Sequence, residues 1–142
     1  MTPDQANTAP LDKGWTNLAG DVRQTFMPSL PSVTAVEVEL VVANPGPPDD
    51  VTMTLLDDGG RVLRVATKPV TVADSERVLF VFANDGLKVS PGKVYSIQVG
   101  GGSVFGWKYV KGGYENRAAS LNRKPLSRNG RSTFLFRTFG AN

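Results

Sequence analysis

The sequence contains no histidine and no cysteine. Without imidazole it lacks the commonest general base and metal ligand, and without thiols it can form neither disulfides nor thiolate centres. Catalytic Ser-His and Cys-His pairs and zinc sites are therefore excluded. The lack of cysteine also leaves the redox compartment open.

Long apolar runs and helical periodicity are missing as well. No stretch approaches the roughly 18 apolar residues that a membrane-spanning helix needs. No window of about 11 residues shows the apolar spacing of an amphipathic helix, and proline or glycine interrupts most candidates. We therefore expect no membrane span and little helix.

What the chain does contain is a series of short alternating segments separated by turn signals. Strands are predicted at 22–26, 36–42, 51–55, 62–66, 78–82, 94–99, 105–109 and 133–139. The run Asp57-Asp58-Gly59-Gly60 tolerates positive φ and predicts a tight hairpin between two of them. About eight strands at this spacing predict an all-β fold, an antiparallel two-sheet β-sandwich of jelly-roll type.

A chain of 142 residues has the length of one domain. Residues 1–20 are predicted to be an irregular lead-in pinned by Trp15, and residues 21–142 to form a single β-sandwich domain, with 112–131 as one long excursion. Residues 1–7 show neither the basic nor the apolar region of a secretory signal. If the protein is exported, this chain has either lost a signal peptide or is part of a longer protein, and we expect the second.

Charge is distributed unevenly. From Lys108 onward there are eight basic residues and one acid, whereas the preceding residues contain eight bases and twelve acids. Such an asymmetry is typical either of a solvated loop or of a site that attracts a polyanion. Nucleic acid ranks lower as the partner, because no nucleic-acid-binding motif is present. Arg137 is interpreted separately, as part of a structural ion pair in the last strand.

Aromatic residues lead into this basic stretch. Phe105, Trp107 and Tyr109 alternate and therefore share one strand face. If the face points inward, they belong to the core; if it points outward, Trp107 and Tyr109 form a platform for stacking on a sugar ring. The candidate ligand-binding residues are Trp107, Tyr109, Tyr114, Arg117, Arg123 and Arg128.

Carboxylates offer two further hypotheses. Glu37 and Glu39 lie two apart on one strand, at a separation that glycosidase pairs use, but the same pattern is typical of a solvated strand face. Loop aspartates could hold a structural calcium together with backbone carbonyls, or simply form turns. They are Asp21, Asp49, Asp50, Asp57, Asp58, Asp74 and Asp85. The glycines at 100–102 are interpreted as a flexible turn, because no helix follows them.

A family resemblance joins several of these segments. The order of Gln24-Thr25-Phe26, a valine-rich strand, the hairpin at 57–60, the segment 87–95 and the Phe-Leu-Phe-Arg-Thr-Phe-Gly ending resembles jelly-roll accessory modules of secreted bacterial proteins, similar to galactose-binding-like and carbohydrate-binding domains. The resemblance covers roughly residues 14–140. It implies a non-catalytic module outside the cell or at its surface, sometimes with a structural calcium and sometimes binding glycans. The basic loop is atypical for a binder of neutral sugars.

Three functions follow as hypotheses. The first is a binding module for a carbohydrate, acidic or neutral, or for another polyanion. The second is a structural, assembly or protein-interaction domain of a cell-surface or particle protein, which could form a homo-oligomer. The third and weakest is a carboxylate enzyme that uses Glu37 and Glu39. Apart from that option we expect no catalysis and, calcium aside, no cofactor.

Overall fold

The computed structural model describes residues 2–7, 14–82, 86–111, 119–122, 124–125 and 132–142. Fifteen strands are found among these residues. They are β1 (Thr2–Asn7), β2 (Gly14–Asn17), β3 (Val22–Phe26), β4 (Ser32–Val38), β5 (Leu40–Val42), β6 (Asp49–Asp57), β7 (Val62–Val70), β8 (Val78–Val81), β9 (Leu87–Lys88), β10 (Tyr95–Gly100), β11 (Phe105–Lys111), β12 (Ala119–Leu121), β13 (Lys124–Pro125), β14 (Ser132–Phe134) and β15 (Phe136–Ala141).

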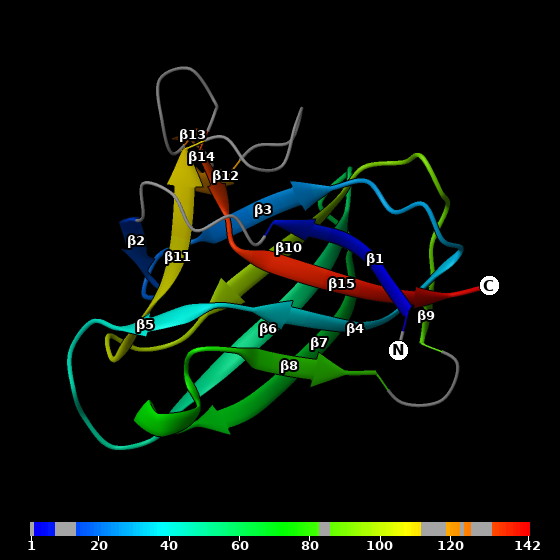
Figure 1. The fold of residues 1–142 in the computed structure, drawn as a ribbon. Coiled ribbons are helices and arrows are strands. Elements are labelled where there is room, and N and C mark those ends of the chain that lie inside the picture. Colours follow the sequence, from blue (N-terminus) through cyan, green and yellow to red (C-terminus); the bar gives the residue numbers. More distant parts are fainter. Residues whose placement is uncertain (1, 8–13, 83–85, 112–118, 123, 126–131) are drawn as a thin grey trace.

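The strands form three antiparallel sheets that pack as a sandwich, which confirms the predicted all-β class (Figure 1). The five-stranded sheet has the order β1-β15-β4-β8, with β9 also paired to β4. The six-stranded sheet, order β13-β12-β3-β10-β6-β7, crosses behind it (Figure 1). The four-stranded sheet has the order β14-β11-β2, with β5 also paired to β11.

The five-stranded and four-stranded sheets are two parts of one layer. β4 runs into β5 with only Glu39 between them, and β14 runs into β15 with only Leu135 between them. The two connecting residues meet, because the Glu39 N–H donates to the Leu135 carbonyl at 3.2 Å. The two sheets therefore meet along a line through Glu39 and Leu135, where both strands are interrupted, and we call this line the kink.

Alternation of side chains explains why the two layers pack. β3 and β10 each bury every second residue, as expected for strands with one face on the core. Their inward residues, among them Phe26 and Ile97, join valines of β4, Phe80 of β8 and Phe136 of β15 in one cluster. This cluster supplies the hydrophobic stabilisation of the fold.

The hairpin predicted at 57–60 is confirmed. β6 and β7 pair in register from Asp49↔Val70 to Leu56↔Val62. Gly60 has φ of 83°, a conformation that glycine adopts at little cost. The Asp57 side chain fixes the turn, since its Oδ1 accepts from the Arg61 N–H at 2.8 Å. The turn-forming residues at 57–60 were therefore sufficient to predict this hairpin from the sequence.

The predicted number of about eight strands is too low. The kink divides two long strands, so the single strands expected at 36–42 and 133–139 each become two. β1 and β2 add strands within the segment expected to be irregular, where no apolar alternation marks them. β1 is held mainly by its backbone ladder on β15, and such pairing leaves little trace in side-chain pattern.

Helical structure in the described part of the chain consists of one 3₁₀ turn, η1 (Val72–Asp74). None of the helices described here is long and apolar enough to cross a membrane.

Candidate functional site

Two of the residues predicted to bind ligand, Trp107 and Tyr109, lie in β11. The other four fall outside the described residues: Tyr114, Arg117, Arg123 and Arg128.

Trp107 belongs to the core. Its side chain is fully buried, and its ring stacks on Phe134 with centroids 4.3 Å apart and planes inclined by 13°. Its Nε1–H donates to the Leu135 carbonyl at 2.9 Å, so the indole stabilises the backbone at the kink. Of the two orientations open for strand 105–109, the structure has the inward one. This corrects the assignment of Trp107 as a ligand platform, because neither ring face is accessible.

Tyr109 occupies an intermediate position. It is half-buried and meets Phe134 edge to face, with centroids 6.1 Å apart. Its ring lies against Gly14, its register partner on β2, where a side chain would overlap the phenol. Tyr109 therefore packs mainly against its own strands.

Among the residues of this region that the structure describes, the exposed aromatic one is Trp15, on β2. It is 47% exposed, although it is among the largest side chains of the protein. The indole lies against the backbone of Gly106 on β11, where a methyl group would stand 2.5 Å from Cε3 of Trp15. Gly106 is buried as a result. The missing side chain at 106 thus provides a seat on which the indole rests, with part of its surface open to solvent.

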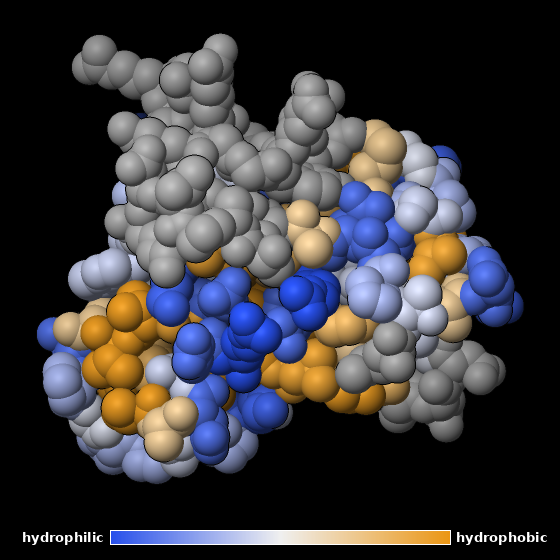
Figure 2. Space-filling view, in the orientation of Figure 1, coloured by the Kyte–Doolittle hydropathy of each residue, from blue (hydrophilic) through white to orange (hydrophobic). Residues whose placement is uncertain are grey.

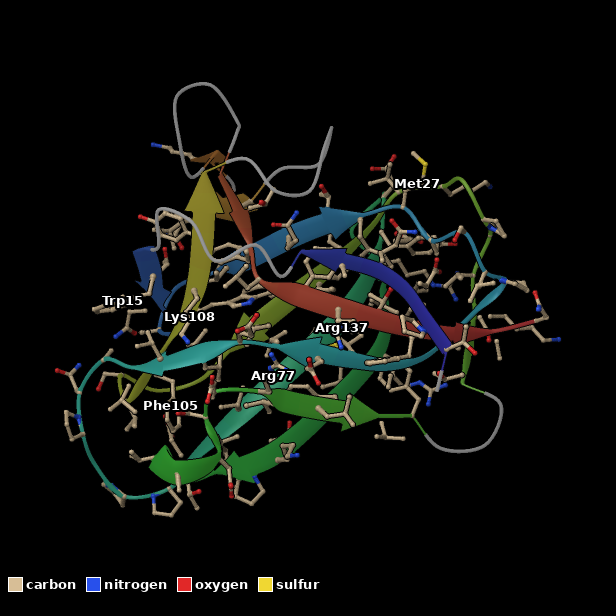
Figure 3. All side chains as sticks on the ribbon, viewed as in Figure 1. Trp15, Met27, Arg77, Phe105, Lys108 and Arg137 are labelled. Atoms are coloured by element: carbon tan, nitrogen blue, oxygen red, sulfur yellow. The ribbon has the colours of Figure 1, made fainter. Side chains whose placement is uncertain are left out.

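Lys108 is the cross-strand neighbour of Trp15. Its N–H donates to the Glu39 carbonyl at 3.1 Å, and its own carbonyl accepts from the Leu135 N–H at 2.9 Å. Both bonds lie on the edge of β11 away from β2, so Trp15 and Lys108 form a non-hydrogen-bonded pair. In such pairs the Cα atoms are only about 4.5 Å apart and the side chains are closest. Figure 3 shows the two residues beside each other.

The two glycines of this strand pair explain the arrangement of its aromatic residues. Trp15 covers Gly106 on the outer face, and Tyr109 covers Gly14 on the inner face. The sequence pattern around Trp15 indicates only an anchor of the lead-in. A glycine at position 106, on the outward face of strand 105–109, was a usable signal that another side chain covers this position. Which aromatic residue covers it depends on the pairing of β2 with β11, and these strands are distant in sequence.

Charged side chains also lie on the outer face of the five-stranded sheet, on the other side of the kink from Lys108. Arg137 pairs in register with Glu37, and Glu37 with Leu79 of β8. Figure 3 shows Lys108, Arg77 and Arg137 on this side of the molecule, and in Figure 2 its middle is strongly hydrophilic. Within the described residues the one ion pair joins Arg23 to Asp21, so the ion pair predicted for Arg137 is not found there.

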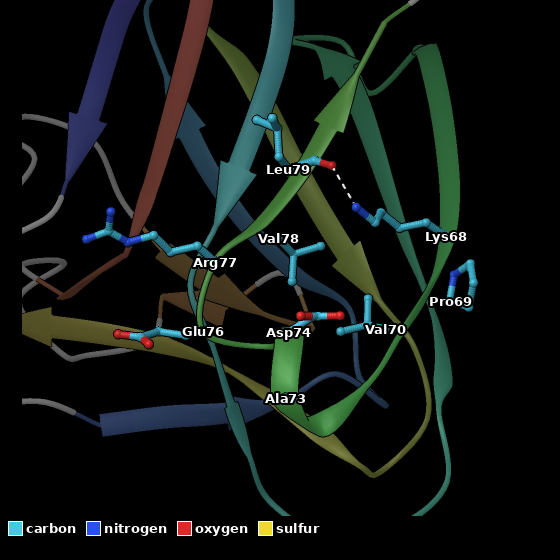
Figure 4. A pocket seen from close by; sticks show the side chains of 9 residues that line it. All are labelled: Lys68, Pro69, Val70, Ala73, Asp74, Glu76, Arg77, Val78 and Leu79. Atoms are coloured by element: carbon cyan, nitrogen blue, oxygen red, sulfur yellow. Dashed lines mark hydrogen bonds between the residues drawn. The ribbon is translucent and has the colours of Figure 1, made fainter.

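A hollow of about 450 Å³ opens between β7, η1 and β8 (Figure 4). Its polar groups are largely engaged: Lys68 Nζ donates to the Leu79 carbonyl at 3.1 Å, and Asp74 Oδ2 accepts from Thr71 Oγ1 at 3.0 Å. Glu76 and Arg77 point to the other side of β8 in Figure 4. Few free groups therefore converge on the hollow, and we regard it as a weaker candidate site than the outer face of β2 and β11.

Several aspartates considered as calcium ligands make contacts that stabilise local structure. Asp49 accepts from the Gly102 N–H, Asp57 fixes its hairpin, and Asp21 pairs with Arg23. No group of three acidic side chains suited to a metal is found among the residues that the structure describes. Asp85 lies outside them. Calcium binding stays a prediction.

The chain matches no protein-family model and no curated protein.

Proposed function

We propose that this domain is a non-catalytic module that binds carbohydrate on the outer face of β2 and β11. The observation that carries the proposal is the exposed indole of Trp15, seated on Gly106 and adjacent to Lys108. A partly exposed aromatic ring with a neighbouring hydrogen-bond donor suits a sugar, whose ring has apolar C–H faces and polar edges.

The packing of the Trp15 indole on Gly106 makes this aromatic surface rigid. β11 is bonded on both edges, to β2 on one side and to β5 and β14 on the other. A ring that is already fixed loses little conformational entropy when a ligand stacks on it. The resemblance to jelly-roll carbohydrate-binding domains supports the same function. The lack of histidine and cysteine supports a module that binds rather than catalyses.

The decisive experiment replaces Trp15. Binding of the parent chain to a panel of neutral and acidic polysaccharides is measured by affinity electrophoresis and calorimetry. Trp15→Ala should weaken binding by roughly tenfold or more, the size of one lost aromatic stacking contact. Trp15→Tyr should retain part of the affinity. Val62→Ala, at an apolar residue 55% exposed on β7, is the matched control and should bind as the parent does. Absence of binding across the panel, or equal binding by Trp15→Ala, would overturn the proposal.

A second candidate, an assembly domain, has one observation in its favour. Four of the five exposed large apolar residues in the described chain lie on β7, η1 or β8. They are Val62, Val65, Val72 and Val81. β7 and β8 are the outermost strands of their sheets, and exposed apolar residues at a sheet edge can mark an interface.

The same edge also carries protection against strand pairing. Lys68 Nζ donates a hydrogen bond to the Leu79 carbonyl, which faces away from β4. Pro69 has no backbone N–H, so β7 lacks a donor at this position. We therefore expect a monomer in light scattering coupled to size exclusion. A stable oligomer without glycan, dispersed by Val65→Lys or Val81→Lys, would favour the assembly function instead.

A further inference from the structure

We propose that the glycan bound at Trp15 is acidic, and that its carboxylate is recognised by Lys108. This inference rests on the proposed function and specifies its ligand class as polymers that contain uronic acids. A uronic acid offers both features the site requires: a ring face for the indole, and an anionic group at the ring edge for the ammonium.

The first step is the position of Lys108. Its backbone is fixed by the two residues of the kink, Glu39 and Leu135, and these bonds make it the close, non-hydrogen-bonded partner of Trp15. A sugar stacked on the indole therefore lies beside the lysine side chain. Lys108 and Trp15 lie close together because the backbone groups of Lys108 face the edge of β11 that is away from β2.

The second step is that the Lys108 charge is free. Among the described residues, no carboxylate forms an ion pair with it, although Glu39 is its neighbour across the kink. In the same residues the cation that lies over an aromatic ring is Arg64, over Phe82, and Lys108 makes no such contact with Trp15. The ammonium is therefore available to an incoming anion.

The third step is the mixed charge of the surrounding face. Arg77 and Arg137 lie on the same side of the molecule as Lys108 (Figure 3), but Glu37 is the register partner of Arg137. A uniformly basic surface would attract any polyanion, nucleic acid included. In the described part of this face, cations are mixed with Glu37, and the cation beside the aromatic ring is Lys108, which favours a ligand with spaced single charges.

The test uses polygalacturonate and the same polymer after its carboxyl groups have been reduced to alcohols. Lys108→Gln removes the charge and keeps much of the length of the side chain. It should weaken binding of the acidic polymer by roughly fivefold at low salt, the upper range for an exposed ion pair, and leave binding of the reduced polymer unchanged. High salt should weaken parent binding of the acidic polymer alone. Lys93→Gln, an equal charge change at an exposed residue of another loop, is the control and should bind as the parent does.

The outcomes separate this inference from the proposed function. If Trp15→Ala abolishes binding while Lys108→Gln and salt have no effect, the module binds neutral sugar and the acidic class is refuted. If Trp15→Ala has no effect, the platform itself is refuted.

If Lys93→Gln weakens binding as much as Lys108→Gln, or if single-stranded nucleic acid binds more tightly than polygalacturonate, recognition is by overall charge and Lys108 has no special role. A sulfated polymer that binds through Lys108 in place of the uronate would also overturn the uronic acid assignment.

Discussion

Two tryptophans with opposite environments define this region at the scale of single residues. Trp107 is fully buried and its Nε1–H bonds to the kink, whereas Trp15 is 47% exposed and rests on a glycine. From the sequence, Trp107 was a candidate platform only if the 105–109 face points outward, and both orientations stayed open, because alternation shows which residues share a face but does not show which face is inward. That choice depends on the opposing layer, which belongs to distant segments of the chain.

This difference predicts the effect of matched substitutions on stability. Trp107→Phe removes the donor to the Leu135 carbonyl and leaves a cavity, and should lower the free energy of unfolding by about 2–4 kcal/mol. Trp15→Phe makes the same chemical change at an exposed position and should alter it by less than about 1 kcal/mol. Urea unfolding followed by circular dichroism compares the two. Similar losses in both variants would contradict the roles assigned to the two indoles.

Gln24 is another residue whose role only the fold reveals. It is fully buried in β3, and its Oε1 accepts from the Phe134 N–H of β14 at 2.7 Å, which ties the six-stranded sheet to the four-stranded sheet. The sequence placed Gln24 in a strand. It contained no local signal for the partner, since the two residues are 110 positions apart.

At the scale of elements, β1 illustrates a strand held by polar contacts. Of the strands in the described residues it pairs with β15 alone, and its ladder is interrupted between Pro3 and Ala6. At this interruption the Asp4 carboxylate accepts hydrogen bonds from the Ser29 N–H and hydroxyl and from the Leu30 N–H. Burial raises the pKa of Asp4, but hydrogen bonds from Ser29, Gln5 and Leu30 outweigh it, so the pKa lies below its ordinary value of 3.8.

The attachment of β1 should therefore depend on acid. A carboxyl with a depressed folded pKa stabilises the fold fully above its unfolded pKa, and this contribution is lost as the pH falls through the folded value. Amide hydrogen exchange in 2–7 should become faster, relative to the intrinsic rate, on acidification from pH 6 to about pH 3, before exchange in β10 does. In Asp4→Asn the exchange of 2–7 should be fast already at pH 6 and change little with acid. Protection of 2–7 that is independent of pH in the parent would refute this account.

The elements also show where sequence signals are adequate. β6 and β7 were predictable because their alternation and their turn lie within about twenty consecutive residues. β1 and β2 were not, because neither carries a core-facing apolar pattern. The candidate site combines both cases: β11 was predicted as a strand, but its partner β2, which supplies Trp15, was not.

At the scale of the whole molecule, the kink determines how the candidate site relates to the core. The layer that contains β15, β4 and β8 continues past Glu39 and Leu135 into β5 and β14, and β11 and β2 attach to that extension. The inner side of the extension carries Trp107 and Phe134, and its outer side carries Trp15 and Lys108. One short sheet thus completes the core on one face and presents the proposed binding surface on the other.

The pairing of β1 with β15 also determines how the domain would respond to force. Thr2 and Gly140 are register partners, so tension that separates these two residues acts across the ladder at its end. The hydrogen bonds would then break one after another, as in a zipper, instead of resisting together in shear. Under such a pull β1 would peel away at low force while the sandwich behind it keeps its packing, and the domain would lengthen by a short segment before it unfolds.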